Sequence, residues 1–103
     1  MEVILKEQLY HALNKWLGLN VYLHFEVNPG GYFRNGKAIL QRVHIKGEGP
    51  YRVFLEFDND HAIIQLDNLT HMSISEDLVI VTGYDEFDRL ARTVEIGLTP
   101  FQV

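Results

Sequence analysis

Cysteine is absent from this chain of 103 residues, and proline, methionine and tryptophan are scarce, with three, two and one copies. The absence of cysteine excludes disulfides, thiol nucleophiles and thiolate metal sites, and it agrees with a reducing compartment. The longest uncharged apolar run, residues 78–84, is far shorter than the roughly 20 residues of a membrane-spanning helix. The N-terminal residues lack the pattern of a secretory signal, a basic region followed by an apolar core. We therefore expect one soluble cytoplasmic domain over residues 1–103, with no membrane contact.

Charge is distributed unevenly within the net value of −5. Residues 34–52 carry five cations and one anion, whereas residues 53–103 carry ten anions and two cations. Such segregation indicates either a basic patch for an anionic ligand or basic and acidic strands that lie side by side and neutralise each other.

Leucine recurs every fourth residue at the N-terminus, at Leu5, Leu9, Leu13 and Leu17. This spacing is typical of an amphipathic helix, which we predict over about residues 3–18, with Gly18 as its left-handed terminator. A lone helix of this length needs cover for its apolar face, so we expect it to pack on a sheet.

From residue 21 to residue 99 the apolar residues alternate with polar ones, and turn-forming residues interrupt the pattern about every ten positions. The clearest case is a strand over 51–57, a turn at 58–60 and a second strand from residue 62. Asn35-Gly36 predicts a further tight hairpin. The predicted fold is mainly β (α+β): a small antiparallel β barrel or sandwich of about seven strands with one N-terminal helix.

Four apolar residues have no obvious place in the core under this alternation: Phe54, Ile63, Val79 and Val81. Contiguous apolar patches are uncommon on monomers. Either the N-terminal helix covers them or they form a surface for a second copy of the chain or for a partner enzyme, and we predict such a surface.

Motifs that carry known chemistry are missing. None of the five histidines has metal-ligand spacing, there is no glycine-rich phosphate loop, and residues 58–63 depart from a calcium loop. We predict no metal and no cofactor, and the sequence assembles no recognisable catalytic set.

One polar face of the predicted sheet could bind a ligand. It places His24, Glu26, Arg42, His44 and Arg52 on the same side of neighbouring strands, where the arginines suit an anion and a histidine titrates near neutral pH. The alternative is a solvated face of cross-strand ion pairs. Aromatic residues beside Arg34 would suit single-stranded nucleic acid, but the negative net charge argues against nucleic acid as a partner.

Three stretches together resemble the YojF-like family of small proteins from Gram-positive bacteria: residues 20–26, residues 32–35, and residues 46–53 with 69–71. This chain is shorter than family members between Pro29 and Arg34. The resemblance implies a compact, mainly β fold, and a gene neighbourhood shared with a deacetylase of low-molecular-weight thiol (bacillithiol) synthesis. We thus expect a non-enzymatic binding or accessory domain that forms a dimer, with a small-molecule site on the histidine and arginine face as the alternative.

Overall fold

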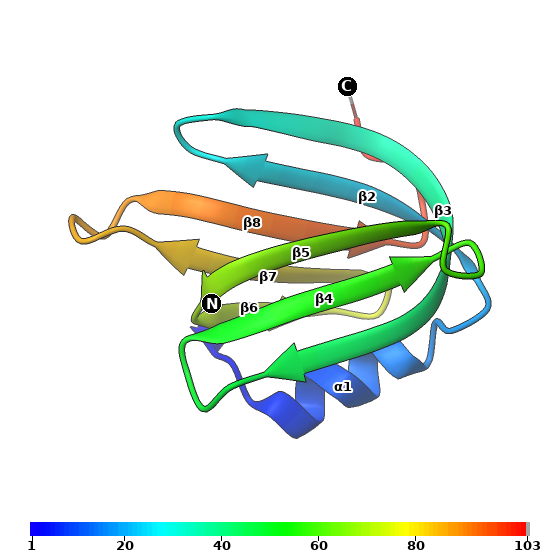
Figure 1. The fold of residues 1–103 in the computed structure, drawn as a ribbon, viewed down its shortest axis with the longest axis horizontal. Helices are drawn as coiled ribbons and strands as arrows, with labels where there is room; N and C mark the ends of the chain where they lie inside the picture. The colour runs from blue at the N-terminus through cyan, green and yellow to red at the C-terminus, as the bar shows by residue number, and fades with distance from the viewer. Residues whose placement is uncertain (103) are drawn as a thin grey trace.

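The structure, a computed structural model, describes residues 1–102, in which eight strands form one antiparallel sheet beside a single helix (Figure 1). In chain order the elements are β1 (Glu2–Val3), α1 (Lys6–Asn14), β2 (Asn20–Val27), β3 (Gly31–Lys46), β4 (Tyr51–Phe57), β5 (Ala62–Leu69), β6 (His71–Ile74), β7 (Leu78–Tyr84) and β8 (Leu90–Gly97). Across the sheet the order is β1-β6-β7-β8-β2-β3-β4-β5. The mainly β prediction with one N-terminal helix is confirmed.

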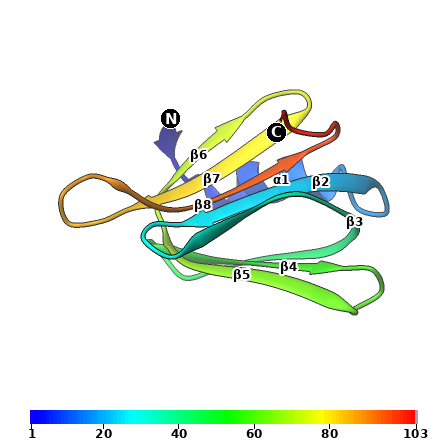
Figure 2. The same ribbon diagram turned by 90° about the horizontal axis from the view of Figure 1, so that it is seen from above.

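The sheet curls into a half-barrel because one long strand belongs to both of its layers (Figure 2). The first half of β3 pairs with β2, and its second half pairs with β4. The hairpin of β4 and β5 consequently folds over β7 and β8, which it approaches without pairing. The fold therefore combines the two predicted architectures, since a single sheet supplies both faces of the core as a sandwich would and curls as a barrel does.

Helix α1 covers the end of the half-barrel between β3 and β6 (Figure 1). Leu9 and Leu13 are fully buried, whereas Leu5 and Leu17 are 47% and 42% exposed. The helix is shorter than the predicted 3–18: residues 2 and 3 instead pair with β6, and after Asn14 the chain continues as turns to Gly18, whose φ is +83°. The hydroxyl of Tyr10 accepts a hydrogen bond of 2.8 Å from the backbone N–H of Ile45, which ties the helix to β3.

The strand pattern predicted from the sequence is wrong at two places in β3, where the strand contains bulges. Asn35-Gly36 is not a hairpin turn, because β3 runs through it and Asn35 is an extra residue between the pairs Leu23–Gly36 and His24–Arg34. Its φ of +65° suits a left-handed bulge as well as it suits a turn, so the dipeptide alone does not distinguish the two. Gln41 is a second extra residue, and the bulge there turns Leu40 into the core.

The predicted partner surface is wrong at two of its four positions. Val79 and Val81 are both fully buried in the core, because β7 is a central strand whose inner face lies beneath the β4–β5 hairpin. Phe54 is half-buried on the outer face, where its ring lies edge-on to His44 at a centroid distance of 5.2 Å. Ile63 is 58% exposed. These four residues therefore do not form one continuous surface.

Candidate ligand-binding cleft

A cleft of about 380 Å³ lies on the outer face of the sheet where β2 meets the first half of β3. We call it the β2–β3 cleft. Its walls are formed by His24, Glu26, Asn28, Gly31, Tyr32 and Arg34. Two of these residues, His24 and Glu26, belong to the site predicted from the sequence.

The bulge at Asn35 determines which residues face the cleft. Because residue 35 is the extra one, His24 pairs with Arg34 and Glu26 pairs with Tyr32. Directly opposed residues of antiparallel strands project from the same face of a sheet. Without the bulge, the register would place residues 35 and 33 opposite His24 and Glu26.

A continuous chain of hydrogen bonds crosses the floor of the cleft. Arg34 Nε donates to His24 Nδ1 at 3.2 Å, and His24 Nε2 lies 3.2 Å from Glu26 Oε1. A guanidinium is always a donor, so Nδ1 is the acceptor and the proton of the neutral ring is on Nε2, which donates to the carboxylate. Asn28 Nδ2 donates to Glu26 Oε2 at 2.7 Å.

His24 is 2% exposed although it lies on the outer face of the sheet. The ring of Tyr32 covers it at a centroid distance of 5.9 Å, and the ring of Phe101 covers it from the C-terminal segment at 6.2 Å. A buried imidazole needs partners for its polar atoms, and Arg34 and Glu26 supply both. The histidine is thus held rigidly at the base of a cleft that is open above it.

Glu26 carries a negative charge in the cleft at neutral pH. The hydrogen bond from Asn28 lowers the pKa of Glu26 below its usual value, and the hydrogen bond from His24 lowers it further, although partial burial opposes both effects. Arg34 contributes a smaller electrostatic effect in the same direction. The cleft therefore contains one cation and one anion on opposite sides of the histidine.

The C-terminal segment, residues 98–102, is attached beside this cleft through Asn35. The backbone N–H of Phe101 donates to Asn35 Oδ1 at 2.7 Å, and Asn35 Nδ2 donates to the carbonyl of Phe101 at 2.8 Å. Arg34 Nη1 donates to the carbonyl of Gln102 at 2.7 Å. The segment therefore positions both the ring that covers His24 and the guanidinium that contacts it.

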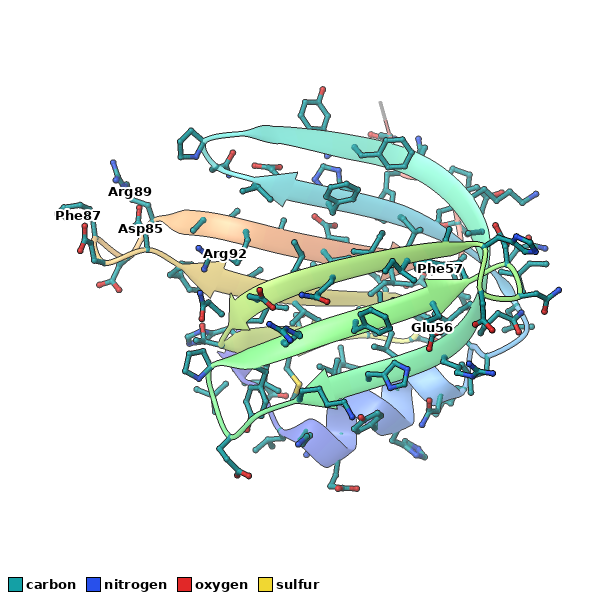
Figure 3. All side chains as sticks on the ribbon, viewed as in Figure 1. Glu56, Phe57, Asp85, Phe87, Arg89 and Arg92 are labelled. Carbon is teal, nitrogen blue, oxygen red and sulfur yellow. The ribbon has the colours of Figure 1, made fainter. Side chains whose placement is uncertain are left out.

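The remaining predicted site residues lie elsewhere on the sheet. Arg42 and His44 are on the second half of β3, and His44 is ten residues along the strand from Arg34, roughly 30 Å at about 3.3 Å per residue. His44 Nε2 is 2.7 Å from Glu56 Oε2, a contact that lowers the pKa of Glu56, and Arg42 Nη1 is 3.7 Å from the same carboxylate. Figure 3 shows Glu56 on β4, away from the β2–β3 hairpin.

Arg52 forms a third group, in which its Nε lies 2.6 Å from Asp67 Oδ1 across β4 and β5. Both side chains are half exposed. The predicted single face is therefore three separate clusters, and those at Arg42 and Arg52 are ion pairs between neighbouring strands, as in the solvated-face alternative.

Sequence reasoning did not assign Asn28, Tyr32, Arg34 and Phe101 to the site. The polar alternation of β2 was sufficient to find His24 and Glu26. Arg34 could have been found only if Asn35 had been recognised as a bulge, and Phe101 lies more than sixty residues away from its partners in sequence. Within residues 1–102, no group of three or more histidine and acidic side chains could hold a metal ion. No helix there is long and apolar enough to cross a membrane.

The fold and the cleft define the class: a small half-barrel β domain with a polar cleft on its outer face. The chain belongs to the DUF1806 family, described as a protein of unknown function, whose model matches residues 3–101. This finding confirms the resemblance recognised from the sequence.

One similar protein is the "Uncharacterized protein YojF" of Bacillus subtilis (strain 168), 29% identical over 118 aligned residues that cover 100% of both chains. The crystal structure of Bacillus subtilis YojF is similar with a TM-score of 0.87 and 30% identity, and the match covers 99% of this chain and 97% of that one. Because the alignment is longer than 103 residues, the relative contains insertions that this chain lacks.

Proposed function

We propose that this protein is a non-enzymatic binding domain that holds a small acidic metabolite in the β2–β3 cleft. The observation that carries the proposal is His24, buried at the base of a cleft between an arginine and a glutamate that both contact it. Clefts that combine a few convergent polar groups with an aromatic wall are typical of small-molecule sites.

Arg34 is the group that would bind the acidic part of the ligand. Its Nε contacts His24 and its Nη1 contacts Gln102, while Nη2 makes no hydrogen bond to residues 1–102. A guanidinium fixed by two hydrogen bonds loses little conformational freedom when it binds a carboxylate or a phosphate. The nearby carboxylate of Glu26 would repel a ligand that is only anionic, so the preferred ligand also carries a donor, an amine or a hydroxyl.

Binding rather than catalysis is supported by the state of His24. Both of its ring nitrogens already have partners within the protein, so proton transfer to a substrate would first require one of these hydrogen bonds to break. A cytoplasmic location of such a domain agrees with the absence of cysteine.

The test is a thermal-shift screen of the purified protein against amino acids, hydroxy acids and sugar phosphates, followed by calorimetry on compounds that stabilise it. We expect saturable binding that Arg34→Gln and Glu26→Gln each reduce at least tenfold. The matched controls are Arg42→Gln and Glu56→Gln, which remove the same residue types from the ion pair between β3 and β4. Equal losses in the controls, or no saturable binding by any compound, would refute the proposal.

A second candidate is an accessory role beside a partner enzyme, such as the deacetylase of low-molecular-weight thiol (bacillithiol) metabolism that the resemblance implies. An exposed aromatic residue supports it, because Phe33 on β3 is 50% exposed and aromatic residues often anchor protein interfaces. Purified deacetylase of the same organism should then co-migrate with this protein in gel filtration. Independent elution at micromolar concentration would argue against this role.

A further inference from the structure

The loop between β7 and β8 is the most projecting part of one end of the molecule (Figures 1 and 2). We call residues 85–89 the hairpin tip. Figure 3 shows Phe87 at its outermost point, with Asp85 and Arg89 beside it and Arg92 further back towards the sheet.

The hairpin tip is rigidly built around one carboxylate. Asp85 Oδ1 accepts hydrogen bonds from the backbone N–H groups of Phe87 at 2.8 Å and Arg89 at 2.9 Å, and Oδ2 accepts one from Arg89 Nε at 2.9 Å. The guanidinium of Arg89 lies 5.0 Å from the centroid of the Phe87 ring. A large apolar side chain held in place before binding loses little entropy when a partner covers it.

The charges at the tip restrict what the partner can be. Glu86 and Asp88 flank Phe87, and neither makes a salt bridge within residues 1–102, whereas Arg89 is paired with Asp85. The surface around the ring is therefore acidic and would repel nucleic acid and anionic membranes. A suitable partner surface is a pocket with apolar walls and a basic rim.

A pocket of about 360 Å³ at the start of β4 on this chain has an apolar part and a basic part. Its lining combines Pro50 and Tyr51 with the cations Lys46 and Arg52 and with Asp67 and Asn68. Arg52 is paired with Asp67, which also lines the pocket, so Lys46 is the lining cation that makes no salt bridge with residues 1–102. Nearby, Lys6 Nζ lies 3.2 Å from the carbonyl of Gly47 and adds a second positive charge. The site is open to solvent, and its volume exceeds the roughly 150 Å³ of an enclosed cavity that holds a benzene ring.

The tip and the pocket lie at the same end of the molecule. Asn68, which lines the pocket, accepts a hydrogen bond on its carbonyl from Arg92 Nη1 at 3.3 Å, close to the base of the β7–β8 hairpin. The β3–β4 loop is at that end in both ribbon views (Figures 1 and 2). A twofold axis beside this end would bring the tip of each copy to the pocket of the other, as a self-complementary dimer interface requires.

We infer that two copies of this chain form a twofold dimer in which Phe87 of each copy enters the pocket at the start of β4 of the other copy. The acidic flanks of the tip, Glu86 and Asp88, meet Lys46 and Lys6 beside the pocket. This inference is independent of ligand binding in the β2–β3 cleft, which lies on β2 and the first half of β3.

Sedimentation velocity of the purified full chain over a micromolar concentration series tests the inference. We expect a reversible dimer whose dissociation constant rises at least about tenfold in Phe87→Ser, because a buried aromatic anchor contributes strongly to an interface. The matched control is Ile63→Ser, which removes another exposed apolar side chain from the outer face and should leave the dimer unchanged. A monomeric wild-type protein, or a Phe87→Ser variant that dimerises as tightly as the wild type, would overturn the inference.

A charge exchange adds a test that does not depend on removing the aromatic ring. Glu86→Lys and Lys46→Glu should each weaken self-association, since both reciprocal contacts of the homodimer then join like charges. An equimolar mixture should form a heterodimer of about wild-type affinity, because both of its contacts again join opposite charges. Weakened homodimers that the mixture does not restore would contradict the reciprocal contact.

Discussion

Asn35 provides the most informative single perturbation, because it combines a left-handed backbone with two hydrogen bonds to Phe101. Loss of these two hydrogen bonds should cost about 1–3 kcal/mol in total at about 0.5–1.5 kcal/mol each. Asn35→Gly keeps the left-handed backbone and loses the hydrogen bonds, with a further entropy cost of ordering a glycine of roughly 0.4–1 kcal/mol. Asn35→Ala adds the strain of a left-handed residue, about 1–2 kcal/mol, and should therefore be the more destabilised variant.

The loss of stability from breaking the two hydrogen bonds has an upper limit, because residues 98–102 can detach while the rest of the half-barrel stays folded. Urea denaturation measures the free energy of unfolding of the three proteins, and hydrogen exchange measures protection of the Phe101 amide. We expect exchange at Phe101 to accelerate in both variants, with a larger loss of stability in Asn35→Ala. An Asn35→Gly variant with wild-type stability and a protected Phe101 amide would refute the assigned role of the side chain.

Three further predictions follow from burial, packing and charge. Val81→Ala removes two buried carbons and should lower the free energy of unfolding by roughly 2 kcal/mol. Ile63→Ala should lower it much less, because Ile63 is 58% exposed. Urea denaturation compares the two variants, and equal losses would contradict the burial of β7. Gly83→Ala should destabilise by about 1–3 kcal/mol, because its Cβ would lie 2.2 Å from the carbonyl oxygen of Asn68; a wild-type melting temperature would contradict this close approach. Hydrogen bonds lower the pKa values of two carboxyl groups in the folded state: that of Glu26 from 4.5, chiefly through Asn28, and that of Asp85 from 3.8, chiefly through the backbone of Arg89. The stabilisation that each carboxylate contributes is therefore present above its ordinary pKa and is lost as the pH falls through its lower folded pKa. Glu26→Gln should accordingly lose less stability than the wild type between neutral pH and pH 3, measured by thermal unfolding, and an unchanged acid profile would contradict the assigned hydrogen bonds.

Local pattern was enough to predict most of the strands. The alternation over 51–57 and the turn at 58–60 correspond to β4 and the turn before β5, because the hydrogen bonds of a hairpin join residues that are close in sequence. The helix was predicted for the same reason. Its ends were not, since residues 2 and 3 pair with β6, a strand about seventy residues away.

The candidate site was only partly predictable. Polar residues at alternate positions of β2 indicated His24 and Glu26, but joining them to Arg42, His44 and Arg52 assumed a flat and regular sheet. The bulges at Asn35 and Gln41 and the bend of β3 separate these residues into three clusters. A bulge changes which residues oppose each other, and its effect on the site depends on the partner strand.

The sequence by itself determined the class of fold, the family and the position of most strands, because these depend on periodicity, turn residues and motifs within short segments. Only the tertiary structure decided that Val79 and Val81 belong to the core, that Arg34 and Phe101 meet at His24, and that Phe87 projects from one end. An apolar strand with two nonpolar faces has the same local pattern whether the protein or a partner covers it. The curl of the sheet places the β4–β5 hairpin over β7, and this long-range packing shows that the protein itself covers the strand.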